Sequence, residues 1–306
     1  MGTQRIGFIG LGNMGGRMTA CIIRAGQEVL GFDARAENIS AVGATPAASG
    51  AAVADGSDVV LLSLPDSRVV EAVVFGSEGH GDDGLLAHIR PGQVVVDLST
   101  SAPESTRRIN ALFAERGAQY IDAGISGGAA AADKGALTLM VGGDEAALDS
   151  VRGVLGYFAS NIFYVGSSGA GHTTKLLNNF LNAVALSATA EVMVAAKKAG
   201  LDLATVLEVF NKSSGVNFAT INRFPKIITG DYLKGGLTNT LMMKDVTLYA
   251  DLLAQLGVAS LNSAGPMASF GLARALGYAD EINNTVVDAI GDISGGIRLY
   301  DGEVGA

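Results

Sequence analysis

The sequence contains a single cysteine, Cys21, among its 306 residues. One cysteine excludes an internal disulfide framework and a zinc site built from several thiolates. A free thiol behaves as a small hydrophobic group, so Cys21 is expected on an apolar helix face. Histidine is also scarce, and neither His80 nor His88 has metal-ligand spacing with the acidic residues. The sequence therefore predicts no metal site.

Basic residues are outnumbered, with 21 Lys and Arg against 30 Asp and Glu and a formal net charge of -9. A nucleic-acid binder usually needs a basic face, so no nucleic-acid partner is expected. Because the net charge is negative, a site for an anionic substrate needs positive potential from nearby groups, such as clustered backbone N–H groups or a single lysine. The 48% of hydrophobic and 17% of charged residues exclude a disordered or fibrous chain. The length allows two domains, each with its own core.

The sequence has no long apolar run free of polar residues. Its most apolar stretch, residues 176–196, contains Asn178, Asn179, Asn182 and Glu191, which argues against a membrane span. The first residues lead directly into a predicted strand and leave no room for a signal peptide. A cytoplasmic location without a membrane partner is therefore expected.

The first half alternates short β-branched runs with helical patterns, which is typical of βαβ units and a parallel sheet. The second half, from about residue 171, is helical. Residues 166–171 are small and are expected to separate a domain 1–166 from a domain 167–306. The predicted fold is a doubly wound, mostly parallel α/β Rossmann sheet followed by an all-α C-terminal domain. Strands are expected at 5–9, 28–32, 59–63, 94–98, 119–121, 137–141 and 162–165, and helices at 14–25, 68–75, 104–116, 173–198, 203–211, 239–256, 264–275 and 282–292.

The strongest motif is the glycine loop Gly10-Leu11-Gly12-Asn13-Met14-Gly15, which lies between a predicted strand and a predicted helix. In a dinucleotide-binding loop the first glycine allows a tight turn, the second lets the backbone approach the pyrophosphate, and the third permits close packing of helix on strand. The phosphates bind the free N–H groups at the helix N-terminus. The alternative is a turn that only connects a strand to a helix.

Asp33, at the end of the second predicted strand, can accept hydrogen bonds from the adenosine ribose hydroxyls. Its charge repels a 2′-phosphate, so NAD is the preferred cofactor. NADP remains an alternative cofactor, because Arg35, two residues after Asp33, can bind the 2′-phosphate.

Two more strand ends are expected at the cofactor crevice. Leu64 and Pro65 follow the third strand, and Ser99 and Thr100 follow the fourth. Ser99 and Thr100 have a second interpretation as N-caps of the helix that follows Pro103.

The segment Ser126-Gly127-Gly128 exposes several N–H donors at a strand end and can form a nest for a carboxylate. Taken alone, the same residues describe an ordinary turn. Further along, Lys175 and Asn179 are four residues apart and so share one face of an apolar helix. A lysine there is costly unless it faces a cleft, and desolvation makes lysine a better proton donor to an alkoxide. The alternative is a lysine that extends from a core helix to the surface. His172 is expected to cap or pack.

Together these motifs resemble the β-hydroxyacid dehydrogenases, which include 3-hydroxyisobutyrate dehydrogenase and tartronate semialdehyde reductase. The resemblance runs from Gly7 to about Gly277 and rests on four ordered motifs. They are the glycine loop, residues 122–128 with 135–143, residues 169–179, and Lys244-Asp245.

The resemblance implies that Lys175 is the catalytic acid/base, that Asn179 orients the substrate, and that residues 126–128 hold the substrate carboxylate. It also implies cofactor contacts at Leu64, Pro65, Thr100 and Lys244, and a homodimer or homotetramer formed through the helical domain. The expected reaction is hydride transfer between NAD or NADP and a small 3-hydroxy acid or its semialdehyde.

The chain departs from the family pattern at Gly124 and Ile125, where Pro and Val are usual, so the substrate loop is expected to be looser or to fit another substrate. Residues 213–218 lie where the family varies with substrate. Asn178 stands where 6-phosphogluconate dehydrogenases have His, and imine reductases lack the lysine matched by Lys175. Reductases of those two types and a cofactor-binding module without catalysis are the remaining alternatives.

Overall fold

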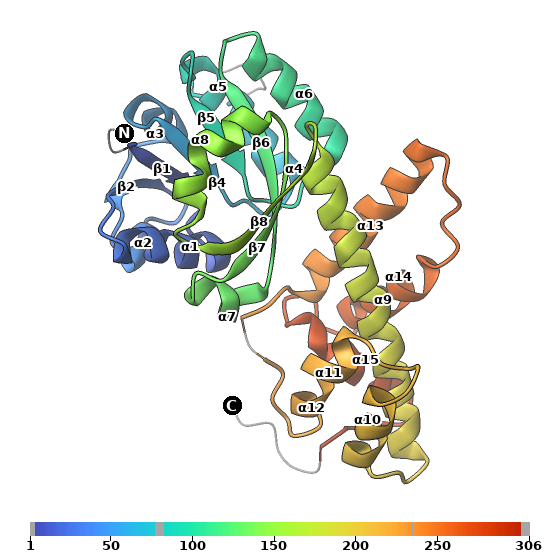
Figure 1. Ribbon diagram of the computed structural model, residues 1–306. Helices are drawn as coiled ribbons and strands as arrows, with labels where there is room; N and C mark the ends of the chain where they lie inside the picture. The colour runs from blue at the N-terminus through green and yellow to red at the C-terminus, as the bar shows by residue number, and fades with distance from the viewer. Residues whose placement is uncertain (1–3, 77–82, 234, 301–306) are drawn as a thin grey trace. The chain divides into compact units, whose positions relative to one another are not determined.

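The computed structural model describes residues 4–76, 83–233 and 235–300, so His80 lies outside the described residues. The chain divides into two compact units, Met1–Lys175 and Leu176–Ala306. The division falls within the long helix α9 (Ala170–Lys198), which begins in the first unit (Figure 1).

The first unit contains an eight-stranded sheet with the order β3-β2-β1-β4-β5-β6-β7-β8. Its neighbouring strands are parallel except for the antiparallel pair β6 and β7. The doubly wound, mostly parallel sheet that the sequence predicted is therefore confirmed. The strands are β1 (Ile6–Ile9), β2 (Val29–Phe32), β3 (Thr45–Pro46), β4 (Val59–Leu62), β5 (Val94–Asp97), β6 (Gln119–Ser126), β7 (Leu137–Gly142) and β8 (Ala159–Gly166).

The central strands are apolar because both faces of the sheet are covered. Every residue of β1, β4 and β5 is buried, as expected for parallel strands between two helical layers. One core joins the sheet to α1 (Asn13–Arg24), α2 (Ala36–Val42), α7 (Gly128–Asp133) and α8 (Glu145–Leu155). A second core joins it to α3 (Gly50–Gly56), α4 (Ser67–Phe75), α5 (Leu85–His88) and α6 (Pro103–Ala114).

Two features of this unit differ from the sequence expectation. Strand β6 continues five residues beyond the expected end at Ile121, and it pairs with β7 in regular register up to Ser126. Five elements besides the two-residue β3 were not expected, namely α2, α3, α5, α7 and α8. Four of these helices have four to seven residues, which is too short for a clear 3.6-residue period.

The second unit is helical, as expected. It contains the rest of α9, together with α10 (Leu203–Asn211), α11 (Phe218–Asn222), α12 (Phe224–Ile227), α13 (Asn239–Leu256), α14 (Ala264–Ala275), a 3₁₀ turn η2 (Asn283–Thr285) and α15 (Val286–Ile293). Gly257 ends α13 in the left-handed conformation that is typical of a C-cap glycine. Fully buried residues on α9, such as Leu186 and Met193, belong to the core of this unit.

Arg223 connects three parts of the second unit. Its guanidinium donates to the side-chain oxygens of Asn283 at 3.0 Å, Asn284 at 2.6 Å and Asn182 at 3.1 Å. No carboxylate forms an ion pair with Arg223 among the described residues, and burial lowers the pKa of its guanidinium to about 10. Three neutral amide oxygens and the Phe218 ring, whose centroid is 5.7 Å from Arg223 Cζ, replace water around this charge. A buried charge is costly without such partners, so the three hydrogen bonds help to keep it inside the fold.

We predict that Arg223→Met lowers the free energy of unfolding by about 2 kcal/mol or more, because three asparagine oxygens lose a charged donor. Thermal or urea denaturation measures the change. Arg274→Met, at an exposed position on α14, is the matched control. Equal stability of the two variants would contradict the assigned role.

Candidate active site

The strand order reverses beside β1, because β2 lies on one side of it and β4 on the other. The Gly10 N–H donates to the Phe32 carbonyl at 2.9 Å, and the Ser63 N–H donates to the Ile9 carbonyl at 3.0 Å. The carboxyl ends of β1, β2 and β4 therefore meet at one edge of the sheet. In open α/β sheets this switch in strand order is where ligands bind.

Each glycine of the loop meets a different steric constraint. Gly10 has φ +88°, and a Cβ there would lie 2.3 Å from the Ser63 carbonyl oxygen. At Gly15 a Cβ would collide with the Gly10 carbonyl oxygen, so helix α1 packs directly on the turn. At Gly12 a Cβ would have no neighbour within 4 Å, which leaves the backbone open to an approaching group. The three positions fit the turn, the packing contact and the pyrophosphate approach of a dinucleotide loop.

Helix α1 starts directly after Gly12 and presents its N-terminus to the same space. Gly12 gives no side-chain cap, and the first turn of α1 has no acidic residue. The first-turn N–H groups and the positive end of the helix dipole are therefore suited to a diphosphate.

Asp33 follows β2 and faces the glycine loop. Its Oδ2 accepts the Leu11 N–H at 2.7 Å, and its Oδ1 accepts from the Arg35 N–H at 2.8 Å and the Asn38 side chain at 3.0 Å. The carboxylate is thus fixed beside the loop, where an adenosine ribose can donate to it. Arg35 itself is exposed and is the N-cap of α2.

The ends of β4 and β5 are joined by a side chain. The buried Ser99 hydroxyl accepts the Leu64 N–H at 2.9 Å, and the Ser99 N–H donates to Asp97 at 3.0 Å. Pro65 is exposed, and Thr100 is half-buried. The N-cap of α6 is Ala102, which has no side-chain cap. The interpretation of Ser99 and Thr100 as caps of this helix is therefore wrong, because the Ser99 hydroxyl is used between strands.

The substrate loop begins where β6 ends. Ser126 is half-buried, whereas Gly127 and Gly128 are exposed and have φ +124° and +70°. Side chains rarely adopt such angles, which is why this turn needs glycine. Gly124 and Ile125 are strand residues paired with Met140 and Leu139. These two residues do not loosen the loop, because both belong to a regular antiparallel ladder. The other expectation, a loop that fits another substrate, stays a prediction.

The first turn of α9 is bound to β6 by a carboxylate. Asp122 is fully buried, and it accepts the Gly169 N–H at 2.8 Å and the His172 N–H at 2.7 Å. An acidic side chain at a helix N-terminus satisfies unpaired N–H groups and interacts favourably with the helix dipole. Asp122 therefore ties the start of α9 to the sheet.

Asp97 on the neighbouring strand β5 is buried in the same network. Its Oδ2 accepts the Tyr120 hydroxyl at 2.8 Å, and burial together with this carboxylate raises the pKa of Tyr120 well above its usual range. The buried His172 ring lies 2.7 Å from the Thr106 hydroxyl and 3.3 Å from the Asp97 carbonyl oxygen. The His172 ring thus packs, which is one of its two expected roles, and joins α9 to β5 and α6.

Lys175 lies one turn after this anchored segment and is only 9% exposed. Its Cβ and Cγ pass so close to Gly124 that a Cβ on Gly124 would be 2.5 Å and 3.0 Å from them. The stem of the lysine therefore rests on the bare backbone of β6. Gly124 is two residues before Ser126, so both lie on the same face of the strand.

Asn179 follows one turn later on α9, on the same helix face as Lys175. It is 4% exposed, and its amide donates to Asp245 Oδ2 at 2.5 Å. Lys244 Nζ lies 3.2 Å from the other oxygen of Asp245. Asp245 thus joins the two residues of the second unit that the sequence assigned to the site.

Sequence reasoning did not assign roles to Asp97, Asp122 or Asp245. Asp122 and Asp245 lie within motifs that the sequence analysis names, but the sequence does not show that their carboxylates are buried. Asp97 ends an apolar β-branched run, which is the one signal that placed it at the edge of the sheet.

No group of three or more His, Cys, Asp and Glu side chains suited to a metal occurs among the described residues. Within the same residues, α9 is long and apolar enough to span a membrane, but 56% of its most apolar window is buried. Such burial is what the core helix of a soluble protein shows.

Two family domains match the chain. Residues 5–166 match the one described as the NAD binding domain of 6-phosphogluconate dehydrogenase, and residues 169–290 match the one described as NAD-binding of NADP-dependent 3-hydroxyisobutyrate dehydrogenase.

Curated relatives and solved structures agree with these matches. The chain is 39% identical to the NAD-dependent L-serine dehydrogenase of Pseudomonas aeruginosa over 88% of this chain and 90% of that protein. It is 37% identical to the 2-(hydroxymethyl)glutarate dehydrogenase of Eubacterium barkeri over 80% of each. The structure of Mycobacterium tuberculosis 3-hydroxyisobutyrate dehydrogenase with L-serine is similar with a TM-score of 0.79 at 30% identity, and the match covers 94% of this chain and 98% of that one.

Fold, site and matches define a nicotinamide-dependent oxidoreductase with a Rossmann sheet followed by a helical region. The chain belongs to the β-hydroxyacid dehydrogenase family. It is an enzyme that binds NAD, with NADP as the alternative cofactor, and it transfers a hydride to or from a small hydroxy acid. The relatives favour this reading over an imine reductase, a 6-phosphogluconate dehydrogenase or a module without catalysis.

We predict that Asp33→Ser weakens NADH binding about tenfold, because ribose hydroxyls lose a charged acceptor. NADPH binding should strengthen, since the repulsion of its 2′-phosphate is removed. Fluorescence titration with both cofactors measures the ratio. Asp149→Ser, at an exposed position on α8, should leave it unchanged. An unaltered NADH preference in Asp33→Ser would exclude Asp33 from cofactor selection.

Proposed function

We propose that Lys175 is the acid/base of a reversible dehydrogenation of small 3-hydroxy acids. The observation that carries the proposal is a buried lysine whose stem rests on β6, two residues before the Ser126 turn. A lysine in this place is costly to the fold unless its amine faces a polar partner or a substrate.

In the oxidation direction, Lys175 accepts the proton of the substrate hydroxyl, and in reduction it returns that proton to the alkoxide. The positive amine also stabilises negative charge that develops on this oxygen. When bound, the nicotinamide accepts or donates the hydride at its C4 atom. The lysine therefore needs only to exchange one proton in each direction.

The substrate carboxylate binds the turn formed by Ser126, Gly127 and Gly128. Three consecutive N–H groups with two residues in the left-handed region make a concave donor surface that suits an anion. Fixing the carboxylate places the carbinol carbon at a constant distance from the turn, which is a positioning contribution to the rate. Asn179, one turn after Lys175, is the residue proposed to orient the substrate hydroxyl.

The glycine loop residues 10–15, Asp33, Leu64, Pro65, Ser99, Thr100 and Lys244 are proposed to bind the cofactor. The open approach at Gly12 and the fixed carboxylate of Asp33 support the first part of this assignment. Lys244 is assigned on the family motif, and its ion pair with Asp245 keeps its amine beside Asn179.

The substrate class follows from the chemistry that the site supports and from the names of the relatives. L-serine, 2-(hydroxymethyl)glutarate and 3-hydroxyisobutyrate all carry a hydroxyl on the carbon β to a carboxylate. We therefore propose a 3-hydroxy acid, or the matching semialdehyde, as the substrate of a cytoplasmic enzyme.

Replacement of Lys175 by Ala tests the function. NADH absorbance at 340 nm, a property of the cofactor, is followed with the three hydroxy acids named above, using NAD and NADP. We expect kcat to fall at least 10²-fold, because proton transfer loses its acid/base, while NADH binding measured by fluorescence stays within about twofold.

Lys198→Ala is the matched control, because Lys198 is an exposed residue at the end of the same helix. Near-normal turnover of Lys175→Ala would overturn the assignment. No turnover of any of the three acids by the unmodified enzyme would overturn the proposed substrate class.

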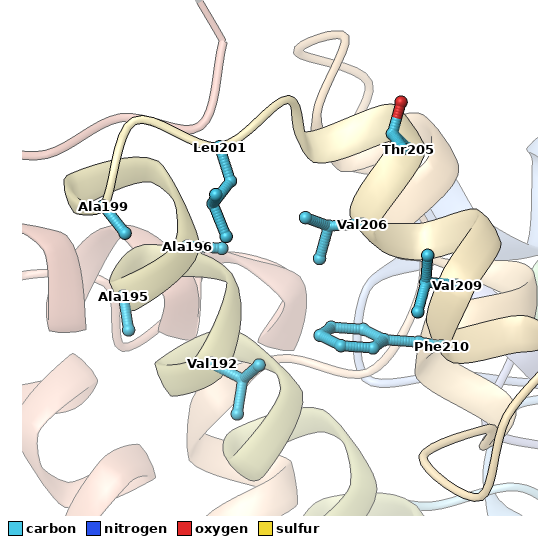
Figure 2. A pocket seen from close by; sticks show the side chains of 9 residues that line it. All are labelled: Val192, Ala195, Ala196, Ala199, Leu201, Thr205, Val206, Val209 and Phe210. Carbon is cyan, nitrogen blue, oxygen red and sulfur yellow. The ribbon is translucent and has the colours of Figure 1, made fainter.

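We further propose a homodimer or homotetramer formed through the second unit. An apolar hollow of about 510 Å³ lies between α9 and α10. Figure 2 shows Leu201, Val206 and Phe210 pointing into the space between the two helices. Val192, Leu201 and Val209 expose about half of their surface, and a contiguous apolar surface of this kind is typical of a contact between subunits.

We predict that Val209→Glu reduces the molar mass measured by size-exclusion chromatography with light scattering, since an unpaired charge would be buried at the contact. Val69→Glu makes the same change at an exposed valine of the first unit and should leave the mass unchanged. An unaltered mass for Val209→Glu would exclude this surface from the contact.

A further inference from the structure

We propose that one face of β6 sets the position of the Lys175 amine and that Gly124 is the positioning residue that makes this possible. The inference rests on the proposed role of Lys175 as acid/base. The family usually has proline at this position, so the placement of Lys175 by Gly124 is a property of this chain.

Alternate residues of a strand share a face, so Tyr120, Asp122, Gly124 and Ser126 lie in a row along β6. The register with β7 is continuous from Asp122 to Ser126, so no bulge breaks the row. Helix α9 begins against this row. Asp122 holds its first N–H groups, Gly124 contacts the Lys175 stem, and Ser126 begins the substrate turn.

The helix approaches the sheet as closely as backbone allows. A Cβ on Gly171 would lie 2.4 Å from the Met140 carbonyl oxygen and 2.6 Å from that of Asp122. A Cβ on Gly142 would lie 2.6 Å from the Gly171 nitrogen. Because backbone faces backbone on both sides, α9 cannot move nearer to β6, and the two hydrogen bonds of Asp122 oppose its movement away.

Gly124 is the point at which this close approach reaches the catalytic side chain. An alanine Cβ there would lie 2.5 Å from Lys175 Cβ, 3.0 Å from its Cγ and 3.3 Å from the Gly171 carbonyl oxygen. The first of these contacts involves a Cβ atom, which moves only if its own helix backbone moves. With α9 at this distance from β6, a side chain added at residue 124 of this chain therefore displaces Lys175 or the first turn of α9.

Displacement of the lysine should change the rate of the reaction, whereas a general loss of stability should change the free energy of unfolding. Overpacking by one methyl group typically costs about 1–3 kcal/mol, so the protein is expected to stay folded. A misplacement of a catalytic group by 1 Å can cost about 10²-fold in rate. Turnover should therefore fall far more than binding or folding.

The test compares Gly124→Ala with Gly7→Ala. Gly7 is a buried strand glycine of β1, where an added Cβ would also collide with side chains, at 2.4 Å from Ser57 Oγ and Val53 Cγ1. We expect Gly124→Ala to lower kcat 10- to 100-fold and to displace the pH profile of kcat, with KM for the hydroxy acid and Kd for NADH within about twofold. Gly7→Ala should keep the kcat and the pH profile of the unmodified enzyme.

Asp122→Asn provides a second variant if Gly124→Ala yields no folded protein. The amide offers one acceptor in place of two and turns an N–H₂ group towards an N–H donor, so the first turn of α9 is released on one side. The same fall in kcat and displaced pH profile, with NADH binding retained, is the expected result.

The outcomes separate this inference from the proposed function. Full activity in Lys175→Ala would overturn the role of the lysine itself. An inactive Lys175→Ala together with normal kcat and an unshifted pH profile in Gly124→Ala would overturn only the positioning role. Equal losses of kcat in Gly124→Ala and Gly7→Ala would also overturn it, because both would then follow from stability.

Discussion

The buried carboxylate of Asp122 holds the start of helix α9 against the sheet of the first unit. It lies on β6 of the Rossmann sheet and accepts two N–H groups from the first turn of α9, the helix that continues into the second unit. A carboxylate with no exposure is stable only when hydrogen bonds and a favourable field replace its water. The N-terminus of a long helix supplies both. This contact fixes where α9 starts, and Lys175 lies in the next turn.

A second group of buried polar side chains surrounds this contact. Asp97, Tyr120, Thr106 and His172 are all buried and are linked by hydrogen bonds that run from β5 and β6 to α6 and α9. Such networks are stable only when their members are satisfied, and they then hold one arrangement of the elements. In this protein the arrangement they hold is the edge of the sheet at which cofactor and substrate are proposed to bind.

Close approaches between segments of the chain explain why the site contains so many glycines. At Gly10 and Gly15 a side chain would collide with backbone of the turn, and at Gly142 and Gly171 it would collide with backbone of helix or strand. At Gly124 it would collide with the Lys175 side chain. The first pair forms the nucleotide turn, and the other three let α9 lie directly on the sheet. Both sets of glycines therefore allow close approaches that only a residue without a Cβ permits.

Local signals in the sequence are sufficient to predict the doubly wound sheet, the helical second half and the positions of the main helices, because β-branched runs and helical periodicity depend on neighbouring residues. Helices α10, α13 and α14 begin and end at the expected residues. Residue type and spacing also identified the glycine loop, Asp33, Ser126 and Lys175 as candidate site residues.

Tertiary structure alone decided how far β6 extends, what Ser99 binds and why residue 124 is glycine. Strand β6 continues to Ser126 because β7 returns to pair with it, and that partner lies a helix away in the sequence. Ser99 bonds Leu64, which is 35 residues earlier, so no local pattern separates this role from a helix cap. The sequence alone predicts a loose loop at Gly124, and only the position of α9 shows that it contacts Lys175. Its role comes from a contact between segments about fifty residues apart, and such contacts are set by packing of the whole sheet edge rather than by the residues beside it in the chain.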